Sequence, residues 1–149
     1  MTEYSKLIAI CAQRHSLDPW LMEALVLTES SGRADAFRFE PAFYDRYLKG
    51  KAEWADQIPR RVSSSYGLMQ IMYPVAKELG FNGEPEMLFV PSVNLTWGCL
   101  KFSQLLGWAA GDENRALCAY NGGKVGNVAA PFRNQSYADK VFTHRKRLG

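Results

Sequence analysis

The sequence is poor in the residues that build metal sites and nucleophilic triads. Its three cysteines and two histidines are Cys11, Cys99, Cys118, His15 and His144. They show no zinc-ligand spacing, and an odd number of cysteines cannot all pair within one chain. We therefore expect three free thiols in the core, no metal and no cofactor. A zinc hydrolase and a Ser/His/Asp enzyme are both disfavoured.

Long hydrophobic runs are also missing. The longest, such as Leu7–Ala12, fall far short of the roughly 20 apolar residues that cross a bilayer, so we expect no stable membrane insertion. The N-terminus lacks a basic segment followed by an apolar stretch and a small-residue cleavage site, so we expect no secretory signal. Contents of 47% hydrophobic and 22% charged residues are ordinary globular values and argue against disorder.

The length and the charge of the chain limit the number of domains and the kinds of partner that we expect. A chain of 149 residues suits one domain, residues 1–149, and buries about 70% of its unfolded surface. The net charge of +3 suits an anionic partner without requiring one. The basic end, residues 144–147, either attracts such a partner or favours a helix C-terminus. No recognised nucleic-acid module is present, so we expect no nucleic-acid partner. We also expect a monomer.

Helical signals dominate the pattern. We expect a first helix from Glu3 to Arg14 with Thr2 as its N-cap. A second helix begins at Asp18-Pro19 and stops at Gly32. Further helices are expected at residues 41–48, 74–80, 91–109 and 113–120, and from Ser136, as N-cap, to the C-terminus. No segment shows convincing strand alternation, so the fold class is mainly α.

One carboxylate lies where a helix is otherwise apolar. Met22, Leu25, Val26 and Glu29 fall at i, i+3, i+4 and i+7, so Glu29 shares the apolar face of the second helix. Burial penalises the charged form and should raise the pKa of Glu29. A carboxyl group that keeps its proton near neutral pH can protonate the leaving oxygen of a glycosidic bond. The alternative is a capping or salt-bridged glutamate, although a helix C-terminus disfavours a carboxylate.

Three further segments follow this glutamate in order. They are Gly67-Leu68-Met69-Gln70, Ala119-Tyr120-Asn121-Gly122-Gly123 and Tyr137-Ala-Asp-Lys-Val141. Together with the helix that ends in Glu29-Ser30-Ser31-Gly32, they resemble the catalytic domain of lytic transglycosylases and goose-type lysozymes. The resemblance covers about residues 20–141. Each string alone is weak, but their order and spacing make the set specific.

The resemblance implies both a fold and a reaction. The fold would be lysozyme-like, with an active-site cleft between lobes and a small β-hairpin that we would place within residues 55–72. The reaction would be cleavage of the β-1,4 bond between N-acetylmuramic acid and N-acetylglucosamine in bacterial peptidoglycan. In lytic transglycosylases a single glutamate serves as acid and then as base, and a 1,6-anhydro product forms without water.

The resemblance also assigns residues to the site. Glu29 would be the acid and base. Substrate contacts are expected from the segment that would form the cleft floor, namely from Ser65, Gly67, Met69 and Gln70. A glycine allows close approach of a sugar, and a glutamine side chain both donates and accepts hydrogen bonds.

The two later motifs would complete the cleft. Tyr120 is expected to hydrogen-bond or orient the Glu29 carboxyl, Asn121 to contact sugar and Tyr137 to close the site. Core packing remains the alternative for Met69 and Tyr137. A plain helix stop is the alternative for the segment that begins at Asn121.

Residues 33–66 depart from the pattern of many relatives because this connection is long and carries several acids. Glu40 is the first candidate for a second carboxylate that positions a water, which would make the enzyme a hydrolytic muramidase. The alternative is that these acids are solvated or paired with arginines. Trp54, in the same polar stretch, is the tryptophan most suited to stacking on a sugar.

Two broader alternatives concern the role of the whole chain. A catalytically inactive wall-binding or assembly protein could keep the same fold. A compact catalytic domain of this kind looks like a phage endolysin, made in the host cytoplasm and acting on the periplasmic wall. A virion-associated or secretion-system lysin, or a trimmed bacterial enzyme, is the other possibility.

Overall fold

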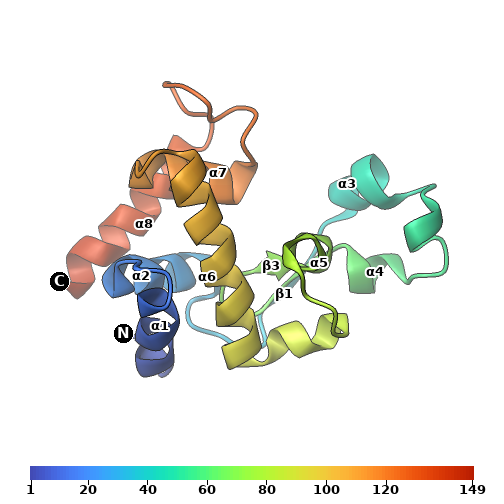
Figure 1. Ribbon diagram of the computed structural model, residues 1–149, viewed down its shortest axis with the longest axis horizontal. Helices are drawn as coiled ribbons and strands as arrows, with labels where there is room; N and C mark the ends of the chain where they lie inside the picture. Colours follow the sequence, from blue (N-terminus) through green and yellow to red (C-terminus); the bar gives the residue numbers. More distant parts are fainter.

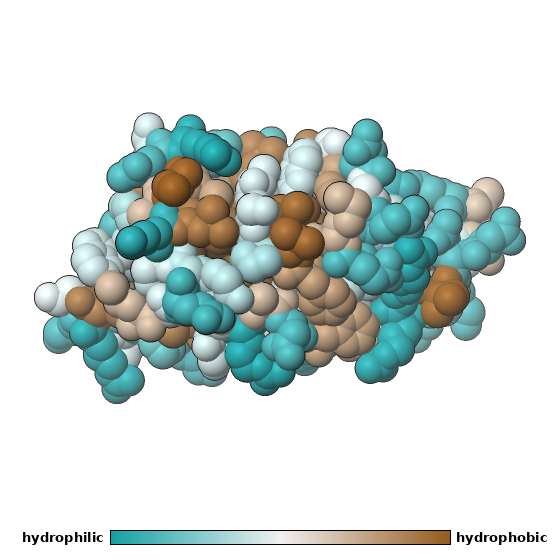
Figure 2. Space-filling model, turned by 90° about the horizontal axis from the view of Figure 1, so that it is seen from below, coloured by the Kyte–Doolittle hydropathy of each residue, from teal (hydrophilic) through white to brown (hydrophobic).

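The computed structural model describes residues 1–149. The long helix α6 (Pro91–Trp108) runs through the middle of the molecule, with helices from both chain ends on one side and the strands with several short helices on the other (Figure 1). No helix combines the length and apolar character needed to span a bilayer. On the face shown in Figure 2, hydrophilic side chains dominate the end of the molecule that carries α3 and α4.

The larger lobe is built on α2 (Pro19–Ser30), which packs against α1 (Ser5–Gln13) and α8 (Gln135–Leu148). Helix α7 (Glu113–Gly122) lies between α6 and α8. Residues 21–26 of α2 are all buried, so this helix is the centre of the core. Asp18 caps α2 through the Trp20 amide at 2.9 Å, and Asp112 caps α7, as their sequence positions predict. The three cysteines are free and buried, which confirms that expectation.

Two expected N-caps, Thr2 and Ser136, are each wrong by two residues, because the observed N-caps are Tyr4 and Asn134. Helix α1 begins at Ser5 because the Thr2 hydroxyl accepts a hydrogen bond from the Tyr4 amide, and the Thr2 amide donates to Glu23 of α2 at 2.5 Å. Thr2 therefore anchors a preceding turn and does not cap the helix. Helix α8 begins at Gln135, before Ser136, because the Asn127 side chain accepts from the Asn134 amide at 3.1 Å and fixes that turn.

The smaller lobe holds an antiparallel sheet of β1 (Phe37–Phe39), β2 (Ser64–Tyr66) and β3 (Ile71–Met72), in that order. The expected hairpin within residues 55–72 is confirmed by the pairing of β2 with β3. The strand β1 was not expected, because its three residues are too few to show an alternating pattern. It pairs with β2 in a register that sets Arg38 opposite Ser65.

Short helices fill the rest of this lobe. They are α3 (Pro41–Phe43), a π-helical turn (Tyr44–Leu48), a 3-10 turn (Ala52–Trp54), α4 (Pro59–Val62), α5 (Tyr73–Leu79) and a 3-10 turn (Pro85–Phe89). Trp54 is buried with Leu48 and Val62, and the Lys77 ammonium lies 5.1 Å from its ring. The expected sugar-stacking role of Trp54 is therefore wrong, because its ring packs into the core of the small lobe.

Candidate active site

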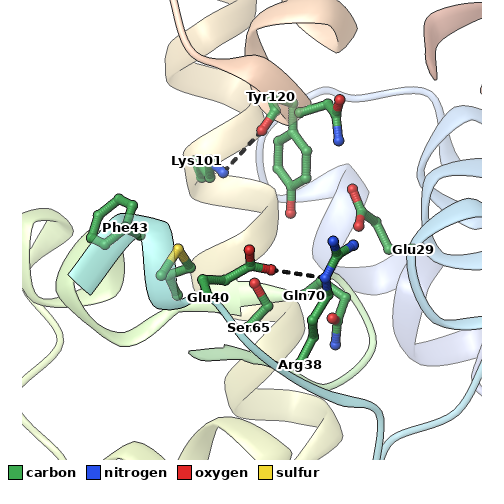
Figure 3. A pocket seen from close by; sticks show the side chains of 10 residues that line it. Glu29, Arg38, Glu40, Phe43, Ser65, Gln70, Lys101 and Tyr120 are labelled. Carbon is green, nitrogen blue, oxygen red and sulfur yellow. Dashed lines mark hydrogen bonds and ion pairs between the residues drawn. The ribbon is translucent and has the colours of Figure 1, made fainter. Parts of the chain in front are cut away.

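A cavity of about 350 Å³ lies where the two lobes meet beside α6 (Figure 3). Its walls come from α2, the sheet, the segment after β1, α6 and α7. The residues that line it are Glu29, Arg38, Glu40, Phe43, Ser65, Gln70, Met72, Lys101, Tyr120 and Asn121. Several elements that are far apart in the sequence therefore supply polar groups to one space.

Glu29 stands in the last turn of α2, at one side of this cavity. Burial raises the pKa of its carboxyl group. A hydrogen bond from the Tyr137 hydroxyl, at 2.5 Å, and the positive charge of Lys101 act in the opposite direction without cancelling that rise. Glu29 is thus a carboxyl group that holds its proton more tightly than a solvated glutamate and is still accessible from the cavity.

The two tyrosines do not keep the roles that the motifs suggested, and Tyr137 is not among the residues that line the cavity. The Tyr120 hydroxyl donates to the Met69 carbonyl at 2.6 Å and makes no hydrogen bond to Glu29. Tyr137, in the first turn of α8, donates to the Glu29 carboxyl. The direct bond expected from Tyr120 is therefore wrong, because the packing of α8 on α2 brings Tyr137 to that carboxyl. Tyr120 still lines the cavity, and Asn121 lies beside it.

The turn between β2 and β3 contributes less to the cavity than expected. Ser65 and Gln70 line it, but Gly67 and Met69 do not. Met69 is fully buried against Gly98, where an added Cβ would lie 2.3 Å from the Met69 sulfur. A substrate contact from Met69 is therefore wrong, and its alternative as a core residue is confirmed.

Gly67 serves the packing of the turn and not the approach of a sugar. Its φ is +71°, and an added Cβ would lie 2.6 Å from the Asn94 amide nitrogen and 2.8 Å from the Leu88 carbonyl oxygen. Only glycine fits this left-handed and crowded position. The side-chain nitrogen of Gln70 donates to the carbonyls of Ala36 and Gly67, so this glutamine is fixed in the wall of the cavity.

Asn94 of α6 holds this turn, and sequence reasoning missed it. Its fully buried side chain accepts from the Met69 amide at 2.8 Å and donates to the carbonyls of Tyr66, at 2.6 Å, and Leu88, at 2.8 Å. The only signal for this role is an amide residue placed directly between the apolar Val93 and Leu95.

Lys101 was also missed. Its ammonium donates to the Tyr120 carbonyl at 3.3 Å and lies 4.0 Å from the centre of the Tyr120 ring. Burial lowers the pKa of Lys101 to about 8, although the negative charge of Glu29 opposes this shift. The lysine therefore brings a positive charge into the same cavity as Glu29.

The second carboxylate suggested by the sequence, Glu40, lies in this cavity as well. It pairs with Arg38 at 3.3 Å, and Figure 3 shows it across the pocket from Glu29. Its charge adds to the rise in the pKa of Glu29. No group of three or more His, Cys, Asp or Glu side chains lies together in a way that could hold a metal ion.

Comparison with known proteins relates this architecture to a known family and to a solved structure. The model of the transglycosylase SLT domain family matches residues 6–141. Among solved structures, the chain is similar to an inactive mutant of the lytic transglycosylase Slt from Pseudomonas aeruginosa, with a TM-score of 0.73 and 20% sequence identity. The match covers 98% of this chain and 24% of that chain, so the sequence spans about a quarter of its length. The likeness confirms the expected lysozyme-like, mainly helical fold.

Proposed function

The chain belongs to the transglycosylase SLT domain family, and we propose that it cleaves peptidoglycan glycan strands with Glu29 as the acid and base. The bond cut is the one between N-acetylmuramic acid and N-acetylglucosamine. The observation that supports this proposal best is the Glu29 carboxyl in a cavity between the lobes, with its pKa raised by burial. A raised pKa is what general acid catalysis near neutral pH requires.

The reaction needs only one carboxyl group if the substrate takes part. Protonated Glu29 gives its proton to the glycosidic oxygen as the bond to C1 breaks, and the 2-acetamido oxygen of the muramic acid supports the positive charge on C1. The Glu29 carboxylate then removes the proton of the C6 hydroxyl while O6 bonds to C1. The proton lost in the first step is recovered in the second, and the product is a 1,6-anhydro sugar.

The end group of the product tests this mechanism. We expect mass spectrometry of digested peptidoglycan to show anhydro-muropeptides, each lighter by one water than the corresponding reducing-end fragment. Exclusively reducing ends would contradict the proposed transfer to O6, while glycan cleavage itself would stand.

Tyr137 is the second group that this mechanism employs. Its hydroxyl stabilises the Glu29 carboxylate, so Tyr137→Phe should raise the pKa of Glu29 further. Because the first step uses protonated Glu29, the alkaline limb of the pH–rate profile should move to higher pH. Losing a charge-assisted hydrogen bond to the carboxylate formed in this step should lower kcat about tenfold.

The matched control for this variant is Tyr44→Phe. Tyr44 belongs to the π-helical turn of the small lobe and does not line the cavity. Its profile should coincide with that of the wild type. An alkaline limb that stays in place in Tyr137→Phe would show that Tyr137 does not act on the catalytic carboxyl group.

A hydrolytic muramidase is the second candidate, and one observation favours it. Glu40 lines the same cavity as Glu29, where a carboxylate could direct a water toward C1. Hydrolysis would yield reducing ends, and Glu40→Gln would abolish them. Under the transglycosylase mechanism the same variant should continue to form anhydro ends, because no step passes through Glu40.

A further inference from the structure

Lys101 stands where the Glu29 cavity joins a second groove. This groove has a volume of about 540 Å³ and runs along α5 and the end of α7 as far as Lys124. Its lining is more apolar than that of the first cavity, with Tyr47, Val75 and Leu79 among its residues. The residues common to both spaces are Phe43, Met72, Lys101, Tyr120 and Asn121. A substrate that reacts at Glu29 therefore has a side compartment whose entrance carries an ammonium group.

The Lys101 ammonium has no carboxylate partner in the protein. None of the ion pairs within 4.0 Å includes it, whereas Arg38 pairs with Glu40 and Arg145 with Asp18 and Glu113. One of its three donors bonds to the Tyr120 carbonyl, in the last turn of α7, where the helix dipole favours a cation. The other two have no hydrogen-bond acceptor in the protein, and the face of the Tyr120 ring, 4.0 Å away, is the only other group in contact with the charge.

A cation kept in a cleft without a counter-ion is suited to bind one from the substrate. Taking an ammonium partly out of water is costly unless it is paired. Neutral sugar hydroxyls and acetamido groups would not repay that cost as well as a carboxylate does. Peptidoglycan supplies carboxylates on its muramic acid side only, as the lactyl group of a bare strand or on the peptide attached to that group.

We propose that Lys101 is a specificity-determining residue that binds a carboxylate carried by the muramic acid, so that carboxylate-bearing strands are cleaved in preference to neutral ones. This inference rests on the proposed function and names the chemistry that the site selects. The lactyl carboxylate and a peptide carboxylate are the two sources of this chemistry. A bare strand and a peptide-bearing strand distinguish them.

Lys101 also acts on Glu29, and that effect has to be separated from recognition. Its positive charge lowers the pKa of Glu29, so removing it would change the rate on every substrate alike. Recognition of a carboxylate would change the rate on charged strands alone. The ratio of kcat/KM between charged and neutral strands therefore isolates the recognition.

The experiment compares wild type, Lys101→Met and Lys101→Arg on three substrates. These are peptide-bearing peptidoglycan, bare strands with free lactyl carboxylates, and the same bare strands after conversion of the carboxylates to neutral amides. We expect Lys101→Met to lower kcat/KM about tenfold, mainly through KM, on at least one charged substrate, as loss of a charge-assisted bond implies. On the neutral amide strands, Lys101→Met should show only the effect that acts through the pKa of Glu29 and is common to all substrates. Lys101→Arg should keep most of the preference.

Lys140→Met is the matched control because Lys140 is exposed on α8 and lines neither space. It should behave as the wild type. The charged substrate that Lys101→Met cleaves more slowly identifies the source of the carboxylate. Equal kcat/KM of the wild type on charged and amide strands would overturn the inference while the proposed function stands. Absence of cleavage of any substrate would overturn the proposed function and the inference with it.

The pH dependence of the wild type gives a second test, which does not require any variant to fold. The pKa of Lys101 is lowered to about 8, so the preference for charged strands should decline as the pH rises past that value. The carboxylates of the substrate remain ionised throughout this range. Charged and titratable groups around the two spaces are Glu29, Arg38, Glu40, Tyr120, Tyr47, Glu78 and Lys124. A preference that stays constant across this range would contradict a role for the ammonium.

Discussion

Glu29→Gln is expected to lower the rate of glycan cleavage about a thousandfold, because general acid–base catalysis contributes a factor of this order. Glutamine keeps the shape of the side chain and can still accept from Tyr137, but it has no acidic proton to give. The measurement is the initial rate of release of soluble fragments from purified peptidoglycan. Glu3→Gln, at an exposed position outside the cavity, should retain the rate of the wild type.

The stability of this variant should not fall with its activity. The folded-state pKa of Glu29 is raised above its unfolded value, so wild-type stability falls as the pH rises from about 4.5 through the folded pKa. At neutral pH the variant lacks this penalty and should melt at the same temperature as the wild type or higher. Full activity in a well-folded Glu29→Gln protein would show that the catalytic site is misassigned. A wild type without cleavage would favour a wall-binding protein.

Asn94→Leu is expected to lower the free energy of unfolding by about 3–5 kcal/mol, because leaving a buried polar group without its partner costs about 1–3 kcal/mol. The substitution removes the partner of the Met69 amide and of the carbonyls of Tyr66 and Leu88. Leucine is similar in size, so the loss reports the missing hydrogen bonds and not a cavity. Urea unfolding followed by circular dichroism measures it.

This substitution should also reduce activity in the protein that remains folded. Asn94 fixes the turn that carries Gln70 into the cavity wall, so that wall should loosen. Asn82→Leu is the matched control, since Asn82 is exposed and its side chain makes no hydrogen bond within the protein. It should change the stability by less than about 0.5 kcal/mol. An equally small effect of Asn94→Leu would contradict the role of Asn94 as the support of the turn.

Local sequence signals predicted most of the helices and where they begin. Asp18 and Asp112 were readable as N-caps, and prolines mark the starts of α2, α3 and α6. Apolar spacing on α2 predicted that Glu29 would be partly buried, and the rise in its pKa follows from that burial. Strand β1 could not be predicted, because three residues give no measurable period and the strand exists only through its pairing with β2.

The sequence by itself determined the family, the mainly helical fold and the carboxylate at the end of an apolar helix, because these depend on local spacing and on motifs in a fixed order. The tertiary structure alone decided which neighbours act on that carboxylate. Tyr137 reaches Glu29 across 108 residues of sequence, and Met69, inside a motif, turns into the core while Lys101, outside every motif, faces the cavity. Such contacts depend on how α2, α6, α7 and α8 pack against one another, and periodicity along one helix carries no information about the helix that lies opposite.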